Sequence, residues 1–265
     1  MTWVIGAASI MSTGAIISDS RVHFADGRSA ELLQKIYPVG NYIAAGFAGS
    51  VRIGFEMIDS LKRILAMPAG IGPHAFDPVG VSAEWTPIAR EVFQRAPELE
   101  KRNGAKVIMV GVSPIENMGN EAFPRVYVIR FSAPDFVPQY MNRGLRMCSI
   151  GSGAGVTQYK RSLRPLFRNG SGIHQAHLGG VHQWARTLAF GATIAVRDYP
   201  HAGISEHFHV IGITLGDMAL MNNDMKTYPQ EGEPVVLQMP QVATSWLEFC
   251  DLAEVRHSSG AGAVG

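Results

Sequence analysis

The order of the expected secondary structure elements constrains the fold of this chain most strongly. Segments with strand-like or helix-like hydrophobic periodicity come in blocks: strands, two helices, strands, two helices and strands again. The expected strands are 2–8, 14–19, 35–38, 41–47, 106–112, 125–131, 145–150, 207–214 and 234–238. The expected helices are 50–66, 82–95, 153–168 and 173–196. Two antiparallel sheets packed face to face, with a helix pair on each outer side, satisfy this order. The sequence therefore predicts an α+β sandwich of four αββα layers.

The composition favours a subunit of a larger assembly. Of the 265 residues, 46% are hydrophobic and only 17% are charged, which is a low share of charge for a free monomer. The net charge of +1 gives no case for nucleic-acid binding. No apolar run reaches the ~18 residues that a membrane helix needs, so we expect no membrane association. Cys148 and Cys250 form no disulfide framework, so we expect free thiols in the reducing cytoplasm.

Charge is distributed unevenly along the chain. From Phe136 to Arg197 there is no Asp or Glu, and from Asp198 to the end there are nine acidic residues but only two basic ones, Lys226 and Arg256. One interpretation is a solvated basic face balanced by an acidic tail of the same subunit. The other is a pair of complementary surfaces that meet between neighbouring subunits of a ring.

The N-terminus places Thr2 directly after Met1 and before an apolar run, Trp3–Ala8. Methionine aminopeptidases remove Met1 best when the next side chain is small, and removal leaves a threonine with a free α-amine. A hydroxyl nucleophile and an amine base on one residue form the catalytic unit of an N-terminal nucleophile (Ntn) hydrolase. The alternative is that Met1 stays and Thr2 is an ordinary strand residue.

Five further motifs follow Thr2 in a definite order. They are Asp19-Ser20-Arg21 at a turn, Lys35 before an apolar strand, Gly46-Phe47-Ala48-Gly49, Gly151-Ser152-Gly153 and Arg197-Asp198. In this order and spacing, the sequence resembles the proteasome β-subunit family over about residues 2–215. The likeness is closest to the simpler bacterial threonine peptidase that partners an AAA+ unfoldase.

The resemblance implies a role for each motif. Thr2 would supply the nucleophilic hydroxyl and, after loss of Met1, the amine that acts as general base. Lys35, close to that hydroxyl and paired with Asp19, would lower the pKa of the amine and the hydroxyl. In the resembled family, a Ser and an Asp at the positions of Ser152 and Asp198 hydrogen-bond the terminal amine.

Backbone N–H groups of Ala48 and Gly49 are the expected oxyanion hole, because they precede a helix. Plainer interpretations stay open at each motif. Asp19 and Lys35 could form a surface ion pair of little energetic value, and the Gly49 loop could be a turn that simply needs glycine. The glycines of 151–155 could form a phosphate-binding turn, although the acid expected about 20 residues later is absent.

The sequence departs from the family pattern after Asp198. The family usually has a Ser or Thr three residues later, before a Gly, and this hydroxyl orients the amine. Here His201 or Ala202 takes that place. Either His201 replaces the hydrogen bond or the site has lost activity.

Several histidines raise the question of a metal site. His174, His177 and His182 fall on an expected helix, and His207 and His209 on one face of an expected strand. No acid or cysteine lies at convincing ligand spacing near them. We therefore expect core or interface histidines, with no metal and no cofactor.

The resemblance also suggests how the chain is divided. An Ntn-hydrolase domain is expected over 2–216, a C-terminal extension over 217–257 and a disordered Ser/Gly/Ala-rich tail over 258–265. The aromatic residues of the extension predict a short amphipathic helix at 244–255, which could dock on a neighbouring subunit.

The resulting hypothesis is a threonine endopeptidase that works inside a closed ring of identical subunits. Its substrates would be unfolded polypeptides delivered by an AAA+ unfoldase. One alternative is a catalytically inactive ring-forming or scaffold subunit with the same fold. Another is a small-molecule amidase of the wider Ntn superfamily.

Overall fold

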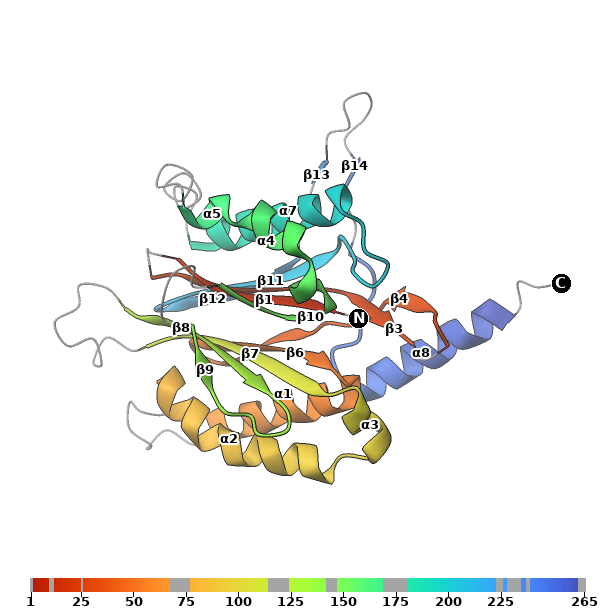
Figure 1. Ribbon diagram of the computed structural model, residues 1–265, viewed down its shortest axis with the longest axis horizontal. Coiled ribbons are helices and arrows are strands. Elements are labelled where there is room, and N and C mark those ends of the chain that lie inside the picture. The colour runs from red at the N-terminus through yellow and green to blue at the C-terminus, as the bar shows by residue number, and fades with distance from the viewer. Residues whose placement is uncertain are drawn as a thin grey trace.

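The computed structural model describes residues 2–9, 12–24, 26–66, 77–113, 124–141, 147–168, 181–222, 226–227, 235–236 and 239–261. Two sheets lie stacked, with one group of helices above the first sheet and another below the second (Figure 1). All strand pairs within both sheets are antiparallel. The structure thus confirms a mixed fold of antiparallel sheets and helices.

The first sheet has the strand order β10-β1-β2-β11-β12. Its strands are β1 (Trp3–Ala8), β2 (Gly14–Asp19), β10 (Met147–Gly151), β11 (Phe208–Thr214) and β12 (Asp217–Asn222). Strands β1 and β2 pair antiparallel as a hairpin. On its other edge, β1 pairs with β10 so that Trp3 lies opposite Gly151. This register brings the start of the chain to the end of β10.

The second sheet has the order β5-β6-β7-β8-β9. Its strands are β5 (Ile36–Gly40), β6 (Ile43–Gly49), β7 (Ala105–Val112), β8 (Val126–Ser132) and β9 (Gln139–Tyr140). Strand β6 is buried over its whole length except Gly49, as its continuous apolar sequence predicts for a strand that is covered on both faces.

The core between the two sheets is apolar and closely packed. Val4, Ile16, Ile108 and Val110 are fully buried there. Gly6 lets the sheets approach, because a Cβ at this position would lie 2.5 Å from Cγ2 of Ile108. Real Cβ atoms do not tolerate such a distance, so the close approach of the sheets requires glycine here.

The helices below the second sheet are α1 (Val51–Leu65) and α2 (Pro78–Arg95). The Ser50 side chain caps α1 by accepting a hydrogen bond from the Ile53 amide. Helix α2 begins at Pro78, four residues before the predicted start. Asp77 caps it by accepting from the Gly80 amide, and a proline at the first helical position has no amide hydrogen to leave unpaired.

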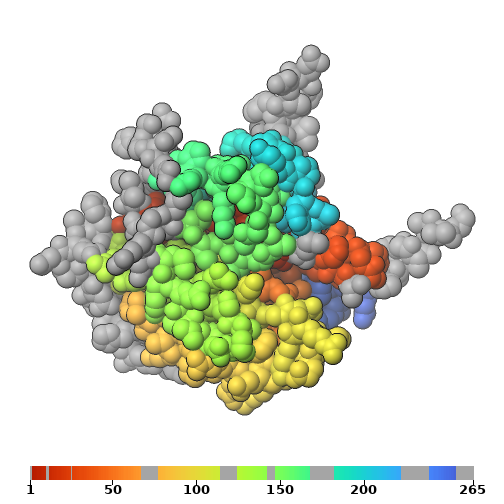
Figure 2. Space-filling view, viewed as in Figure 1, coloured from red at the N-terminus to blue at the C-terminus, as the bar shows by residue number. Residues whose placement is uncertain are grey.

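The helices above the first sheet are α4 (Thr157–Leu163), α5 (Pro165–Arg168) and α7 (Val181–Asp198). The prediction of one helix over 153–168 is wrong: a 3₁₀ turn at Ser152–Gly155 precedes α4, and α5 starts afresh at Pro165. Glycines weaken a helix, and proline cannot continue one. The first part of the helix expected at 173–196 lies outside the described residues. Figure 2 shows α4 beside β8 and β9 on one face of the molecule.

Several short elements were not predicted. Strands β3 (Arg21–His23) and β4 (Ser29–Glu31) pair with each other, and α3 (Glu98–Arg102) fills the link between α2 and β7. Segments this short do not develop a recognisable period. Strand β12 was missed as well, although it is six residues long.

The C-terminal extension contains β13 (Lys226–Thr227), β14 (Val235–Val236) and α8 (Trp246–Ala261). Strand β14 lies within the expected segment 234–238. Helix α8 confirms the helix predicted at 244–255 and continues past Ser258, where we expected the disordered tail to begin. Adding a residue to an existing helix costs far less free energy than starting a new one. A helix can therefore extend into a segment of low helix propensity. Residues 262–265 lie outside the described part.

Candidate functional site

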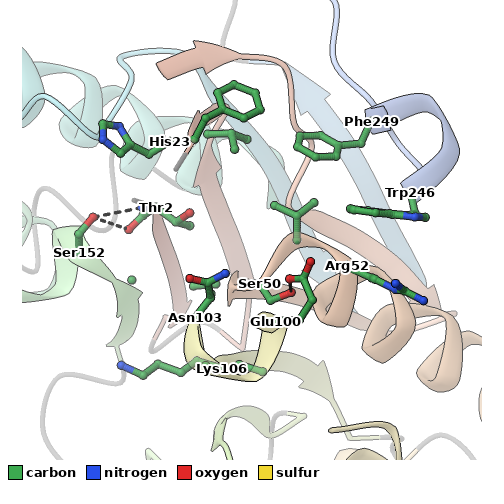
Figure 3. A pocket seen from close by; sticks show the side chains of 18 residues that line it. Thr2, His23, Ser50, Arg52, Glu100, Asn103, Lys106, Ser152, Trp246 and Phe249 are labelled. Atoms are coloured by element: carbon green, nitrogen blue, oxygen red, sulfur yellow. Dashed lines mark hydrogen bonds between the residues drawn. The ribbon is translucent and has the colours of Figure 1, made fainter. Parts of the chain in front are cut away.

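A cleft of about 750 Å³ opens at the start of β1. Thr2 and Ser152 lie at one end of the cleft, and Trp246 and Phe249 of α8 at the other (Figure 3). Residues 48–50, at the junction of β6 and α1, line it as well. The fold thus gathers into one cleft the chain start, the β10 end and the loop expected to hold an oxyanion.

Thr2 and Ser152 are joined by a reciprocal pair of hydrogen bonds. The Thr2 nitrogen donates to the Ser152 Oγ at 3.1 Å, and this hydroxyl donates to the Thr2 carbonyl at 3.3 Å. The Gly153 amide donates to the same carbonyl at 3.3 Å. With Met1 attached, the Thr2 nitrogen is an amide, and removal of Met1 leaves the α-amine at this same atom, beside Ser152.

Gly151 makes this arrangement possible. Its φ of +85° is in the left-handed region, and a Cβ there would lie 2.0 Å from the Thr2 carbonyl oxygen. No side chain fits in that space, so only glycine lets the β10 end approach Thr2 so closely. The Gly-Ser-Gly motif therefore serves here to contact the chain start. These contacts give no support to the phosphate-binding interpretation.

Asp19 and Lys35 form a buried ion pair behind Thr2. The Lys35 Nζ donates to Asp19 Oδ1 at 3.0 Å and to the Arg21 carbonyl at 2.6 Å, and the two side chains are only 1% and 0% exposed. The surface-pair interpretation is therefore wrong. Burial lowers the pKa of Lys35, and the charge of Asp19 opposes this effect.

Asp19 also connects this pair to the chain start. Its Oδ1 accepts from the Trp3 amide at 2.7 Å, and its Oδ2 from the Arg21 amide at 3.1 Å. The carboxylate is thus held by Lys35 and by backbone N–H donors at once. Because Trp3 directly follows Thr2, the position of Thr2 depends on the Asp19 carboxylate.

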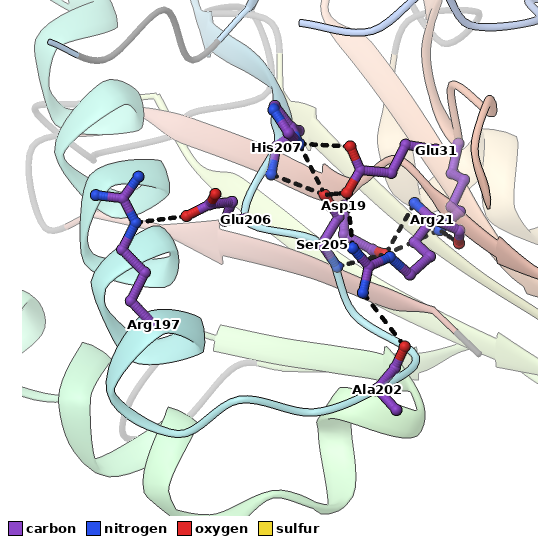
Figure 4. Close-up of polar contacts among 9 residues, drawn as sticks. Asp19, Arg21, Glu31, Arg197, Ala202, Ser205, Glu206 and His207 are labelled. Carbon is purple, nitrogen blue, oxygen red and sulfur yellow. Dashed lines mark hydrogen bonds and ion pairs between the residues drawn. The ribbon is translucent and has the colours of Figure 1, made fainter. Parts of the chain in front are cut away.

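A second set of polar groups, which the sequence did not indicate, lies next to Asp19 (Figure 4). The Ser205 amide donates to Asp19 Oδ2 at 3.5 Å, while its hydroxyl donates to Glu31 Oε1 at 2.6 Å. Glu31 also contacts Arg21 at 2.8 Å and His207 at 2.6 Å. Burial raises the pKa of Glu31, but hydrogen bonds from His207, Ser205 and Arg21 outweigh it and bring that pKa to about 2. No local motif links these residues: Arg21 and Glu31 face each other across the β3–β4 pair, and Ser205 and His207 come from the segment just before β11 (Phe208–Thr214).

Ala48 and Gly49 line the cleft at the end of β6. Gly49 has a φ of +109°, and a Cβ there would lie 2.3 Å from the Gly104 carbonyl oxygen. The Ser50 amide donates to that carbonyl at 2.9 Å. Helix α1 begins at the next residue, so its positive N-terminal end faces this part of the cleft. The glycine is required by the turn, and the turn places the loop beside Thr2.

Asp198 lies apart from the other expected site residues. It is the last residue of α7, it is exposed, and its carboxylate forms no hydrogen bond within the described residues. The Nδ1 of His201 accepts from the Gly203 amide at 3.3 Å. The Ala202 carbonyl accepts from Arg21 Nη1 at 3.3 Å. The structure thus brings together six of the seven expected site residues and leaves out Asp198.

The C-terminal extension packs on its own chain. The Ala243 amide donates to the Leu32 carbonyl at 2.8 Å, and Phe249 stacks on Phe24 of the same subunit with ring centroids 6.3 Å apart. Trp246 in turn stacks on Phe249. The first turns of α8 form an aromatic wall of the cleft (Figure 3). Docking of this segment on a neighbouring subunit stays a prediction.

No group of three metal-ligating side chains lies together within the described ranges, and His174 and His177 lie outside them. His209 is buried, and burial together with the charges of Lys35 and His207 lowers its pKa to about 4. It is therefore a neutral core histidine at physiological pH. Among the described helices, none combines the length and the hydrophobicity needed to cross a membrane.

No protein-family model and no curated protein sequence matches this chain. Among solved structures, eukaryotic HslV from Trypanosoma brucei is similar, with 16% sequence identity and a TM-score of 0.49. The similarity covers 80% of this chain and 99% of HslV. It assigns no residue of this chain a role.

Proposed function

We propose that the chain is a threonine endopeptidase of the proteasome-like Ntn-hydrolase kind, with Thr2 as its nucleophile after removal of Met1. One observation carries the proposal. The Thr2 nitrogen bonds Ser152 at the end of a cleft, while Asp19 bonds both the Trp3 amide and the buried Lys35. If Thr2 only began a strand, it would need neither a cleft nor a buried cation near it.

The mechanism follows from these positions. The Thr2 hydroxyl attacks the carbonyl carbon of a peptide bond, and its proton passes to the Thr2 amine. The backbone N–H groups at Ala48 and Gly49 stabilise the oxyanion. The C–N bond breaks, the leaving amine takes the proton, and an ester to Thr2 remains. Water then hydrolyses the ester, with the same amine as base. Lys35 favours each step by lowering the pKa of the amine through its positive charge.

We further propose that identical subunits form a ring, which takes unfolded polypeptides from an AAA+ unfoldase in the cytoplasm. The low charge content of the chain supports a subunit with buried surface. So do Phe190 and Ile194, which lie one turn apart on α7 and are 43% and 38% exposed. The stacked sheets with outer helices fit the four-layer αββα class that the resemblance implies.

A catalytically inactive scaffold subunit is the second candidate. The exposed position of Asp198 and the lack of a hydroxyl at Ala202 favour it. Both changes would leave the terminal amine with fewer hydrogen-bond partners. Ser205 supplies a buried hydroxyl nearby, but this hydroxyl binds Glu31.

Cleavage of an unfolded protein by Thr2→Ala and Thr2→Ser variants tests the proposal. We expect Thr2→Ala to lose cleavage and Thr2→Ser to keep part of it, because serine retains a hydroxyl and the same amine. Full cleavage by Thr2→Ala would overturn the proposed nucleophile. An assembled wild-type protein that cleaves nothing would favour the scaffold.

A further inference from the structure

A second cleft, separate from the one at Thr2, lies between α4 and the strands β8 and β10. It has a volume of about 450 Å³ and shares no lining residue with the first cleft. Its walls lie on the face shown in Figure 2, where the green α4 lies above the yellow-green β8 and β9. A cleft of this size suits a small molecule.

The lining of this second cleft is strongly basic. Arg130 projects from β8, Lys160 and Arg161 from α4, and Arg164 from the residue that ends α4. None of the lining residues is an Asp or Glu. Within the part of the chain that the structure describes, none of these four cations pairs with a carboxylate. Four uncompensated positive charges around one cavity repel one another, and an anion between them removes that repulsion.

Arg130 supplies an independent sign of a missing partner. Its Nε is buried and has no hydrogen-bond partner among the described residues. Buried guanidinium nitrogens are nearly always paired, so an unpaired one needs an explanation. An anionic oxygen in the cleft would accept from it, and the hydroxyls of Ser149 and Thr157, which also line the cleft, could donate to the same anion.

The remaining walls are apolar. Met141, Met147 and Cys148 line them. Burial raises the pKa of the Cys148 thiol, although Arg130 and Lys160 oppose this effect. The thiol is therefore neutral and adds no negative charge. The cleft thus combines a cationic side with an uncharged, polarisable side, which suits a molecule with an anionic group and an apolar body.

We propose that this cleft binds a phosphorylated small molecule with at least two negative charges on its phosphate groups. Arginine presents its N–H groups in a planar fork that matches two phosphate oxygens, and three of the four cations are arginines. The proposal does not depend on the peptidase activity, because the two clefts share no residue.

Isothermal titration of the intact protein with inorganic pyrophosphate and with ATP, both without divalent cations, tests this. We expect saturable binding of one ligand per chain. The double variant Arg161→Gln/Arg164→Gln should bind about a hundredfold more weakly, at about tenfold for each lost charged hydrogen bond. Both side chains are exposed, at the end of α4, so the variant should fold normally, and circular dichroism checks this.

Two controls separate a built site from general attraction to a basic protein. Arg63→Gln removes an exposed arginine from α1, on the opposite side of the sheets, and should leave the affinity within about twofold. Citrate offers comparable charge on carboxylates and should bind more weakly than pyrophosphate. Absence of saturable binding, equal weakening by Arg63→Gln, or citrate binding as tight as pyrophosphate would each overturn the proposal.

Discussion

At the scale of single residues, the decisive feature is a buried ion pair next to the expected nucleophile: Asp19 accepts from the amide of Trp3, which follows Thr2, and Lys35 donates to Asp19. Lys35 and Asp19 lie in the interior and satisfy each other together with backbone groups. Burying charges is unfavourable unless they are paired and hydrogen-bonded. Apolar residues at these two positions would stabilise the fold at least as well as this ion pair. The charges are therefore kept for function, and we assign both residues to the site.

Replacement of Lys35 tests this assignment through stability. Lys35→Met leaves the Asp19 carboxylate buried without its cation, and we expect a loss of about 3–5 kcal/mol in the free energy of unfolding. Lys101→Met removes a cation paired with the exposed Glu98 and should change that free energy by less than ~1 kcal/mol. Urea denaturation measures both, and similar small losses would contradict a buried pair.

Glu31 gives a pH-dependent prediction. Its pKa falls from 4.5 to about 2 on folding, so its ionised form stabilises the folded state. This contribution is fully present above pH 4.5 and is lost as the pH falls toward 2. It amounts to roughly 3 kcal/mol at most. Glu31→Gln should therefore flatten acid unfolding, followed by circular dichroism, in this window. An unchanged acid transition would contradict the network around Glu31.

At the scale of elements, the sequence predicted the long strands and helices well because each is long enough to show its period. It missed β3 and β4, and it merged the segment 153–168 into one helix although glycine and proline interrupt it. The motif residues of the candidate site could be predicted because each belongs to a local sequence pattern. The Glu31, Ser205 and His207 cluster could not, because it arises only where β4 meets a segment about 174 residues further along the chain.

The junction of β10 with the 3₁₀ turn carries a prediction at this scale. Gly151→Ala would force a Cβ to within 2.0 Å of the Thr2 carbonyl, so we expect the start of β1 to shift. Stability should fall by about 1–3 kcal/mol, and peptide cleavage should be lost. Gly155→Ala is the matched control, because a Cβ there meets nothing within 4 Å. Thermal melts and cleavage assays of both variants decide the matter: equal behaviour of the two would contradict the account.

At the scale of the whole molecule, the C-terminal extension returns to the cleft and lines one end of it with aromatic side chains. The sequence indicated a helix there, but its partner could not be predicted, because an amphipathic helix packs equally well on its own chain or on a neighbour. The outer face of α7 is an exposed apolar surface that could meet a neighbour. Among the described residues, none covers Phe190 or Ile194, which stay exposed to water.

This surface leads to a prediction about assembly. Phe190→Glu/Ile194→Glu places two charges on the outer face of α7, where a subunit contact would bury them at a cost of several kcal/mol. We expect the wild-type protein to sediment as a closed oligomer and the double variant as smaller species. Sedimentation velocity measures this, with circular dichroism to verify the fold. Unchanged sedimentation of the variant would exclude α7 from the subunit interface.

The central claim is that Thr2 becomes the N-terminal residue and the nucleophile. Intact mass spectrometry of the protein from its own host, before and after treatment with a threonine-directed covalent probe, tests it most directly. The account predicts a mass that lacks one methionine, and a single adduct on Thr2 that Thr2→Ala does not form. A mass that retains Met1 would contradict the claim, because no free α-amine would then stand beside Ser152.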